Sequence, residues 1–331
     1  MHGFPPPAAC QAAEAQARWT AAMRAGDFAT AWAIGDAVLA ASDPAARDDP
    51  LLPYHLRRVW DATPPDGRDV LVRCYHGLGD VLMAARLLPM LRARARTVVL
   101  ETPPPLHPLL AGMADRLIPF DPTSPAMPSG CDIELMEVAQ VLRLRADAVP
   151  RPPYLPMPVP MPVPLRLARR PALGLCWRAG EWDAERSVPL DDLRSAVGGA
   201  VLVSLQRGPA AVEARGPGFA NPGDCSGDVG RTAALIAGVD LVVTVDTMVA
   251  HLAGALGAPC CVLLKAAADW RWGEPGGRSL WYPALRLYRQ ERAGDWRAPL
   301  TALARDLGSG TAFKAPARPG AWPWRPARHG S

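Results

Sequence analysis

Residues 70 to 81 have the sequence VLVRCYHGLGDV, which predicts a strand, a tight turn and the start of a helix. The first five of these residues form the strand, and Gly77 and Gly79 let the backbone turn closely after it. The helix begins near Asp80 with free backbone amides, and such amides bind anions. We therefore expect an anion site at the carboxyl end of this strand.

Short apolar strands and helices alternate outward from this stretch. Strands are expected at residues 70–74, 97–101, 117–120, 133–136, 173–177, 201–205, 241–245 and 260–264. Helices are expected at residues 80–95, 106–113, 190–197, 231–237, 249–256 and 295–307. Because parallel strands need helical crossovers, this order predicts an α/β fold with two doubly wound, Rossmann-like sheets. The two halves would face a cleft at the carboxyl ends of both sheets, where ligands bind.

Two segments lie outside this alternation. Residues 11–44 carry apolar side chains at helical spacing and break at Gly26, which predicts a helical hairpin similar to one tetratricopeptide repeat. One repeat cannot bury a core alone, so we expect the hairpin to dock on the body, with peptide binding as the alternative. Residues 148–164 have proline at nearly every second position and are expected to run extended as a linker.

The chain is accordingly expected to divide into six segments, of which the last has no helical or strand periodicity and should be disordered. They are an N-terminal hairpin and connector (1–67), a first Rossmann-like domain (68–147), a proline-rich linker (148–170), a second Rossmann-like domain (171–290), a C-terminal helix (291–307) and a tail (308–331).

Composition narrows the class of protein. The chain has 331 residues, 36 Lys and Arg against 32 Asp and Glu, and a net charge of +4, which does not indicate a nucleic-acid partner. Its seven cysteines lack CxxC spacing, so they are expected to be buried thiols in a reducing compartment. The N-terminus has no signal-peptide pattern, and no apolar stretch approaches the roughly 18 residues that span a bilayer. We therefore expect a cytoplasmic globular protein.

The first-half turn permits two interpretations. Asp80 at the mouth of the cleft is a candidate general base, with His76 as the next candidate; the alternative is that Asp80 only caps the helix or balances its dipole. Gly77, Gly79 and Glu101 also match a dinucleotide-binding fingerprint, although Leu82 stands where its third glycine belongs.

The second half has a corresponding turn at Val245-Asp246-Thr247, followed by a helix. Thr247 and the amides after it can hold phosphate, and His251 one turn later can add a donor. The alternative is that Asp246 or Thr247 only caps the helix and His251 is an interior histidine with its hydrogen bonds satisfied.

Two further loops follow strands of the second half. Arg178 and Arg186 suit a diphosphate, with an exposed loop of Arg–Glu pairs as the alternative. Asp269 and Trp270 offer a carboxylate for hydroxyls or a base edge and an indole for stacking, with a tryptophan-rich packing segment as the alternative.

These motifs together resemble glycosyltransferase family 9, the ADP-heptose:lipopolysaccharide heptosyltransferases, and especially their tetratricopeptide-linked relatives. The resemblance covers approximately residues 68–307. Its motifs are Cys74 to Asp80, Glu181 to Pro189, Val203 to Gln206, Asp240 to Gly257 and Asp269 to Trp272.

The resemblance implies a GT-B fold and metal-independent, inverting sugar transfer without a cofactor. Asp80 matches the family's base, Arg186 stands where a Lys contacts the donor, and Met248 replaces a Gly beside the diphosphate. The residues that we expect to bind the donor are Gly79, Arg178, Arg186, Ser187, Gln206, Asp246, Thr247, His251, Asp269 and Trp270.

We therefore expect an enzyme that moves a heptose or hexose-like sugar from a nucleotide diphosphate, with an ADP-sugar as one candidate, to a hydroxyl of a glycan, protein or small molecule. Contact with the inner face of a membrane is left open. Nothing in the sequence suggests a metal site, because there is no DxD pair and no His/Cys cluster. The alternatives are a catalytically silent nucleotide- or glycan-binding protein and an NAD-dependent oxidoreductase or epimerase.

Overall fold

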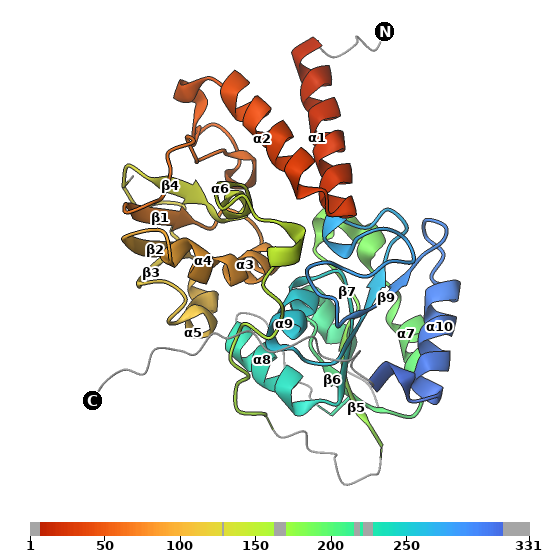
Figure 1. The fold of residues 1–331 in the computed structure, drawn as a ribbon. Coiled ribbons are helices and arrows are strands. Elements are labelled where there is room, and N and C mark those ends of the chain that lie inside the picture. The colour runs from red at the N-terminus through yellow and green to blue at the C-terminus, as the bar shows by residue number, and fades with distance from the viewer. Residues whose placement is uncertain (1–6, 128, 162–169, 215–218, 221–227, 314–331) are drawn as a thin grey trace, which may run out of the picture.

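The computed structural model describes residues 7–127, 129–161, 170–214, 219–220 and 228–313 (Figure 1). The helices are α1 (Pro7–Ala25), α2 (Phe28–Ala41), α3 (Leu78–Ala84), α4 (Leu88–Arg92), α5 (His107–Leu110), α6 (Val138–Val141), α7 (Leu190–Val197), α8 (Val229–Gly238), α9 (Met248–Leu256) and α10 (Arg297–Gly308). The strands are β1 (Asp69–Arg73), β2 (Thr97–Thr102), β3 (Arg116–Pro119), β4 (Asp132–Glu134), β5 (Ala172–Cys176), β6 (Val201–Ser204), β7 (Leu241–Val245), β8 (Cys260–Leu264) and β9 (Arg286–Arg289).

The first sheet has the strand order β3-β2-β1-β4, and all of its pairs are parallel. β1 is the switch strand, because β2 lies on one side of it and β4 on the other. Its register places Arg73 opposite both Glu101 of β2 and Glu134 of β4. The turn that follows β1 therefore leaves the sheet where ligands of open α/β sheets bind.

The second sheet repeats this plan with the order β6-β5-β7-β8-β9, again with parallel pairs. Its switch point lies between β5 and β7, so the turns after these two strands leave the same edge. The edge strand β9 was not predicted, because its sequence RLYR begins and ends with arginine and has no apolar run longer than two residues.

The predicted helices of the second half are present: α7 has the predicted ends, and the ends of α8, α9 and α10 are shifted by at most two residues. Two helices of the first half differ from expectation. The helix expected at 80–95 begins at Leu78 and divides into α3, a short 3-10 turn and α4, and Pro89 stands in the first turn of α4. The helix expected at 106–113 shrinks to a 3-10 turn and α5, a stretch that contains several prolines.

The N-terminal hairpin docks on both halves of the body, as expected for a single helix pair. In α2, the Trp32 indole nitrogen donates to the Leu144 carbonyl of the first half at 2.8 Å. In α1, Arg24 donates to the Ala268 carbonyl of the second half at 2.9 Å, and Trp19 packs edge-on against Trp270. Figure 1 shows the hairpin at one end of the molecule, where it meets both halves.

The two halves also touch directly through α3 and α9. A Cβ atom on Gly79 would lie 2.7 Å from His251 Cδ2 and 3.4 Å from the Met248 backbone, so glycine is what permits this close approach. One buried apolar cluster runs through the hairpin and both sheets, and a second lies on the other face of the second sheet, below α7 and α10. The close packing places the turn after β1 next to the turn after β7.

The proline-rich segment forms neither helix nor strand over its described part, residues 149–161. It is attached to the second half, because the Tyr154 amide donates to Ala255 and the Met161 amide to Ala234. The rest of the predicted linker core, residues 162–169, and the predicted tail from residue 314 onward lie outside the described residues. No described helix is both long and apolar enough to cross a membrane.

Candidate active site

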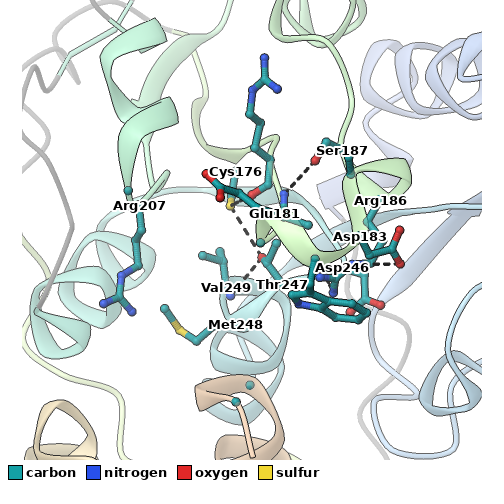
Figure 2. A pocket seen from close by; sticks show the side chains of 18 of the residues that line it. Cys176, Glu181, Asp183, Arg186, Ser187, Arg207, Asp246, Thr247, Met248 and Val249 are labelled. Atoms are coloured by element: carbon teal, nitrogen blue, oxygen red, sulfur yellow. Dashed lines mark hydrogen bonds and ion pairs between the residues drawn. The ribbon is translucent and has the colours of Figure 1, made fainter.

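A cavity of about 1170 Å³ lies between the carboxyl ends of the two sheets. The first half contributes the turn from Gly77 to Asp80, and the second half contributes the loops that follow β5, β6, β7 and β8. The predicted cleft is therefore present at the predicted edge of both sheets. Figure 2 shows its second-half wall, with Thr247, Met248 and Val249 between Arg207 on one side and Arg186, Asp183 and Asp246 on the other.

Asp80 is the acidic side chain that the first half presents to this cavity. It does not cap its helix, because α3 begins after Gly77 and Asp80 lies in the first turn, where its charge balances the helix dipole. Asp80 Oδ1 lies 2.6 Å from Arg271 Nη2, and Arg271 also pairs with Asp269 at 2.7 Å. Burial lowers the pKa of Arg271, but the charges of Asp80 and Asp269 outweigh it and raise that pKa. Arg271 is therefore a permanent cation beside the candidate base.

His76 lies behind the cavity and is not among the residues that line it. Its Nδ1 atom is 3.0 Å from Glu134 Oε1. Burial lowers the pKa of His76, but Glu134 and Asp80 raise it further than burial lowers it. The imidazole is thus oriented by Glu134, and its role as the second candidate base stays a prediction.

The turn after β7 opens the nine-residue helix α9 at the cavity. Thr247 is the N-cap, and its Oγ1 atom accepts the Val249 amide at 3.3 Å. Asp246 does not cap the helix; its side chain is buried, and burial raises the pKa of its carboxyl to about 6. Thr247 therefore caps the helix, as one of the two interpretations expected. It also lines the cavity, so the helix start is located where an anion would bind.

Arg186 lies against this turn. It donates from Nη1 to the Asp246 carbonyl at 3.0 Å, its guanidinium covers the Trp182 ring at 4.0 Å, and Asp183 is 3.5 Å away. Neighbouring Ser187 uses its hydroxyl to accept the Ala179 amide at 3.1 Å, which shapes the loop. Arg186 is thus held at the edge of the helix start.

Arg178 and Gln206 both line the cavity, but Arg178 is exposed and Gln206 is buried. Arg178 pairs with Glu213 at 2.7 Å, and half of its side chain is exposed, as the exposed-loop alternative predicted. Gln206 is buried, and its side-chain oxygen accepts the amides of Trp177 and Arg178 at 3.1 and 2.9 Å. Because Gln206 also lines the cavity, its predicted contact with a donor stays a prediction.

His251 lines the cavity, whereas Trp270 does not, and both are buried. His251 is buried, its Nδ1 atom lies 3.1 Å from the Tyr282 hydroxyl, and burial lowers the pKa of the imidazole well below its ordinary value. Trp270 does not line this cavity; its ring packs against Trp19 and Trp281. This packing agrees with the alternative given for Trp270, and its predicted contact with a ligand stays a prediction.

Sequence reasoning missed three basic residues in the cavity wall, namely Lys265, Arg207 and the partner of Asp80, Arg271. Lys265 follows β8 directly and pairs with Asp183 at 2.8 Å. Arg207 follows β6 and, within the described part of the chain, has no ion-pair partner. The position of Lys265 directly after a buried strand was a signal that pointed to this edge.

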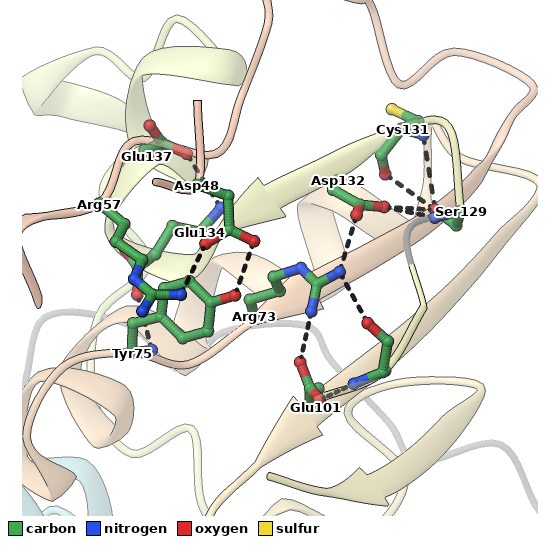
Figure 3. Close-up of polar contacts among 11 residues, drawn as sticks. Asp48, Arg57, Arg73, Tyr75, Glu101, Ser129, Cys131, Asp132, Glu134 and Glu137 are labelled. Carbon is green, nitrogen blue, oxygen red and sulfur yellow. Dashed lines mark hydrogen bonds and ion pairs between the residues drawn. The ribbon is translucent and has the colours of Figure 1, made fainter. Parts of the chain in front are cut away.

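Glu101, the acidic residue of the possible dinucleotide-binding fingerprint, is already paired within the folded chain. Glu101 is fully buried and pairs with Arg73 at 2.9 Å, and Arg73 also binds Asp132 at 3.0 Å (Figure 3). A carboxylate that already neutralises a buried guanidinium is not available to a ribose. Among the described residues there is also no group of three His, Cys, Asp or Glu side chains placed to hold a metal ion.

Residues 228–279 match the family model of glycosyltransferase family 9 (heptosyltransferase). The match lies entirely within the second half. This segment contains α8, β7 and α9 together with Asp246, Thr247 and Asp269, so it forms a large part of the cavity wall. Asp80 lies outside it.

Solved structures with this fold include ADP-heptose lps heptosyltransferase II of E. coli, which is 16% identical, has a TM-score of 0.50 and is covered over 98% of its length by 74% of this chain. A glycosyl transferase of family 9 from Veillonella parvula DSM 2008 is 13% identical at a TM-score of 0.49, with 76% of this chain and 98% of that chain covered. The likeness to the E. coli structure confirms the predicted GT-B fold.

A curated relative matches at the level of sequence. Protein FlbA of Caulobacter vibrioides is 30% identical over 155 residues, which are 43% of this chain and 26% of FlbA. The chain thus spans about a quarter of the length of this relative. The tetratricopeptide-linked subgroup stays a prediction.

Proposed function

We propose that the protein transfers a sugar from a nucleoside diphosphate donor to a hydroxyl acceptor. One observation carries the proposal. The cavity brings a carboxylate of the first half, Asp80, together with the start of helix α9 of the second half, which can bind an anion. Helix α9 lies in the segment that matches the family 9 model. The name of the E. coli structural relative contains ADP-heptose, which makes an ADP-sugar the first donor to test.

In this proposal the diphosphate lies against the first turn of α9. The amides of that turn and the partial positive charge of the helix start face the cavity, as phosphate sites require. Arg186 and Arg207 lie on opposite sides of the turn (Figure 2) and would neutralise the departing diphosphate. Arg207 is the better-placed charge, because Arg186 already shares its charge with Asp183.

Asp80 serves as the general base from the opposite wall. The acceptor oxygen attacks the anomeric carbon and loses its proton to Asp80, while the bond from that carbon to the diphosphate breaks and the diphosphate leaves with the electron pair. Arg271 holds Asp80 Oδ1, which leaves Oδ2 outside the ion pair and directed by it. A base and a leaving group on opposite walls suit one displacement with inversion, and the residues named here need no metal or cofactor.

The ion pair between Asp80 and Arg271 also favours a second candidate function. Arg271 already occupies one oxygen of the Asp80 carboxylate at 2.6 Å, which suits a structural ion pair in a chain that holds a nucleotide or glycan without turning it over. The nicotinamide alternative has no such support, since Glu101 is buried against Arg73.

Incubation of the full chain with a panel of ADP-, UDP- and GDP-sugars, followed by measurement of nucleoside diphosphate release, tests the proposal. Release from one donor class that depends on an added hydroxyl acceptor would support a transferase. Tight binding without release from any donor would support the silent binding protein. Binding of NAD in preference to every nucleoside diphosphate would contradict both.

A further inference from the structure

A second cavity, of about 470 Å³, lies where the hairpin meets the body. Its walls come from three distant parts of the chain: the end of α1 around Arg24, the segment around Arg151 that leaves the first half, and residues 270–283 of the second half. Figure 1 shows the hairpin meeting both halves at this end of the molecule. Such a volume lies within the range of small-molecule sites.

Arginine dominates the charged residues of this cavity. Four arginines line it, Arg24, Arg151, Arg271 and Arg278, against one carboxylate, Glu274. The charge of Arg271 is already balanced by Asp80 and Asp269. The charges of the other three arginines are not balanced by a carboxylate. Arg24 donates to a neutral carbonyl, and Arg151 and Arg278 are exposed and have no ion pair in the described ranges.

Two buried N–H donors in the same wall also lack an acceptor within the described part of the chain. They are Nε of Arg24 and the indole nitrogen of Trp281, whose side chain is almost fully buried. Both nitrogens are enclosed by protein, so the guanidinium groups at the rim are the donors that a molecule in the cavity can reach. Behind the wall, the pKa of Arg289 is lowered by burial and by the charge of Arg24, which agrees with an excess of positive charge here.

The remaining lining is apolar and aromatic. Trp270 and Trp281 meet edge-on with ring centroids 5.7 Å apart, and Val149 and Leu280 complete the surface. Both indoles are buried, and the Arg271 guanidinium covers the Trp270 ring at 4.4 Å, so they form a packed floor of the cavity. Guanidinium groups bind phosphate and carboxylate through paired hydrogen bonds. The cavity therefore has a rim that can bind an anion above a partly apolar floor.

We propose that this second cavity is a binding site for a small molecule of sugar size that carries a phosphate or carboxylate. Arg151 and Arg278 bind the anionic group, and the rest of the molecule lies within the cavity. Arg271 lines both cavities, so a ligand here contacts the residue that holds Asp80. The site does not depend on the proposed transfer reaction.

Calorimetric titration of the full chain with inorganic phosphate, glucose 1-phosphate, glucuronate and neutral glucose tests the proposal. We expect glucose 1-phosphate or glucuronate to bind at least 10-fold more tightly than glucose, and the stronger of the two distinguishes a phosphate site from a carboxylate site. The double variant Arg151→Ala/Arg278→Ala should weaken that binding at least 10-fold. Arg305→Ala, which removes the same kind of exposed charge on α10, should leave it unchanged.

A third variant separates the two cavities. Arg186→Ala alters the large cavity only and should not change the affinity for the anionic sugar. Loss of binding in Arg186→Ala with retention in the double variant would place the anion in the large cavity and overturn the proposal. Equal binding of glucose and both anionic sugars, or no binding of any probe, would overturn it as well. Because the readout is binding, failure of sugar transfer would not affect this result.

Discussion

Asp80 of the first half and Arg271 of the second half are joined by an ion pair of 2.6 Å across the cavity. Arg271 also holds Asp269 and covers the Trp270 ring at 4.4 Å, so the position of the candidate base is linked to the packing between the halves and the hairpin. The pair is largely shielded from solvent, because the Arg271 side chain is only 13% exposed. Ionic strength should therefore affect this pair less than an exposed one.

Arg207→Ala should weaken nucleoside diphosphate binding. Arg207 lines the large cavity without an ion-pair partner in the described part of the chain, so its whole charge is available to a diphosphate. Loss of one charge-assisted contact of about 1.5–3 kcal/mol corresponds to roughly 10- to 150-fold in affinity. Calorimetry with ADP and UDP measures it, with Arg305→Ala as the control for net charge. An unchanged affinity would remove Arg207 from the donor site.

Gly79→Ala should destabilise the fold through the contact between the halves. The added methyl group would lie 2.7 Å from the His251 ring, so α3 and α9 must separate or His251 must move. Overpacking of this kind costs about 1–3 kcal/mol, which thermal or urea unfolding would detect. Gly199→Ala is the matched control, because no heavy atom lies within 4 Å of its added Cβ. Equal stability of the two variants would contradict the close packing of α3 on α9.

Asp246→Asn should change the pH dependence of stability. Burial raises the pKa of this carboxyl from 3.8 to about 6, so the folded chain holds the proton more tightly than the unfolded chain. Relative to the Asn variant, the wild type should lose free energy of unfolding as pH rises from about 4 to 6, by at most about 3 kcal/mol, and change little above that. Urea titrations of both proteins at pH 4, 5, 6 and 7 measure the difference. A difference independent of pH would show that Asp246 is not buried as described.

Most of the scaffold could be predicted from local sequence. Apolar runs such as Leu241–Val245 can only be buried strands between helices, and the turn at Gly77 marks the site edge. Contacts between residues that are distant in the sequence could not be predicted in this way. Trp270 packs on Trp19 from the opposite end of the chain, and no local pattern announces that contact.

The same limit applies to the candidate site. The sequence placed Gln206 in the right loop, but only the fold shows that backbone amides occupy its side chain. Arg271 was present in a quoted motif, yet its pairing with Asp80 needs the two halves brought together. Strand β9 escaped prediction because an edge strand tolerates charged residues.

The most direct test of the account compares wild type with Asp80→Asn in nucleoside diphosphate release from the donor class that the panel identifies. The amide keeps the shape of the carboxylate but cannot take the proton, so we expect turnover to fall about 10²-fold or more while nucleotide affinity changes little. Turnover near that of the wild type, with the protein folded and the nucleotide bound, would contradict the assignment of Asp80 as the base of a sugar-transfer reaction.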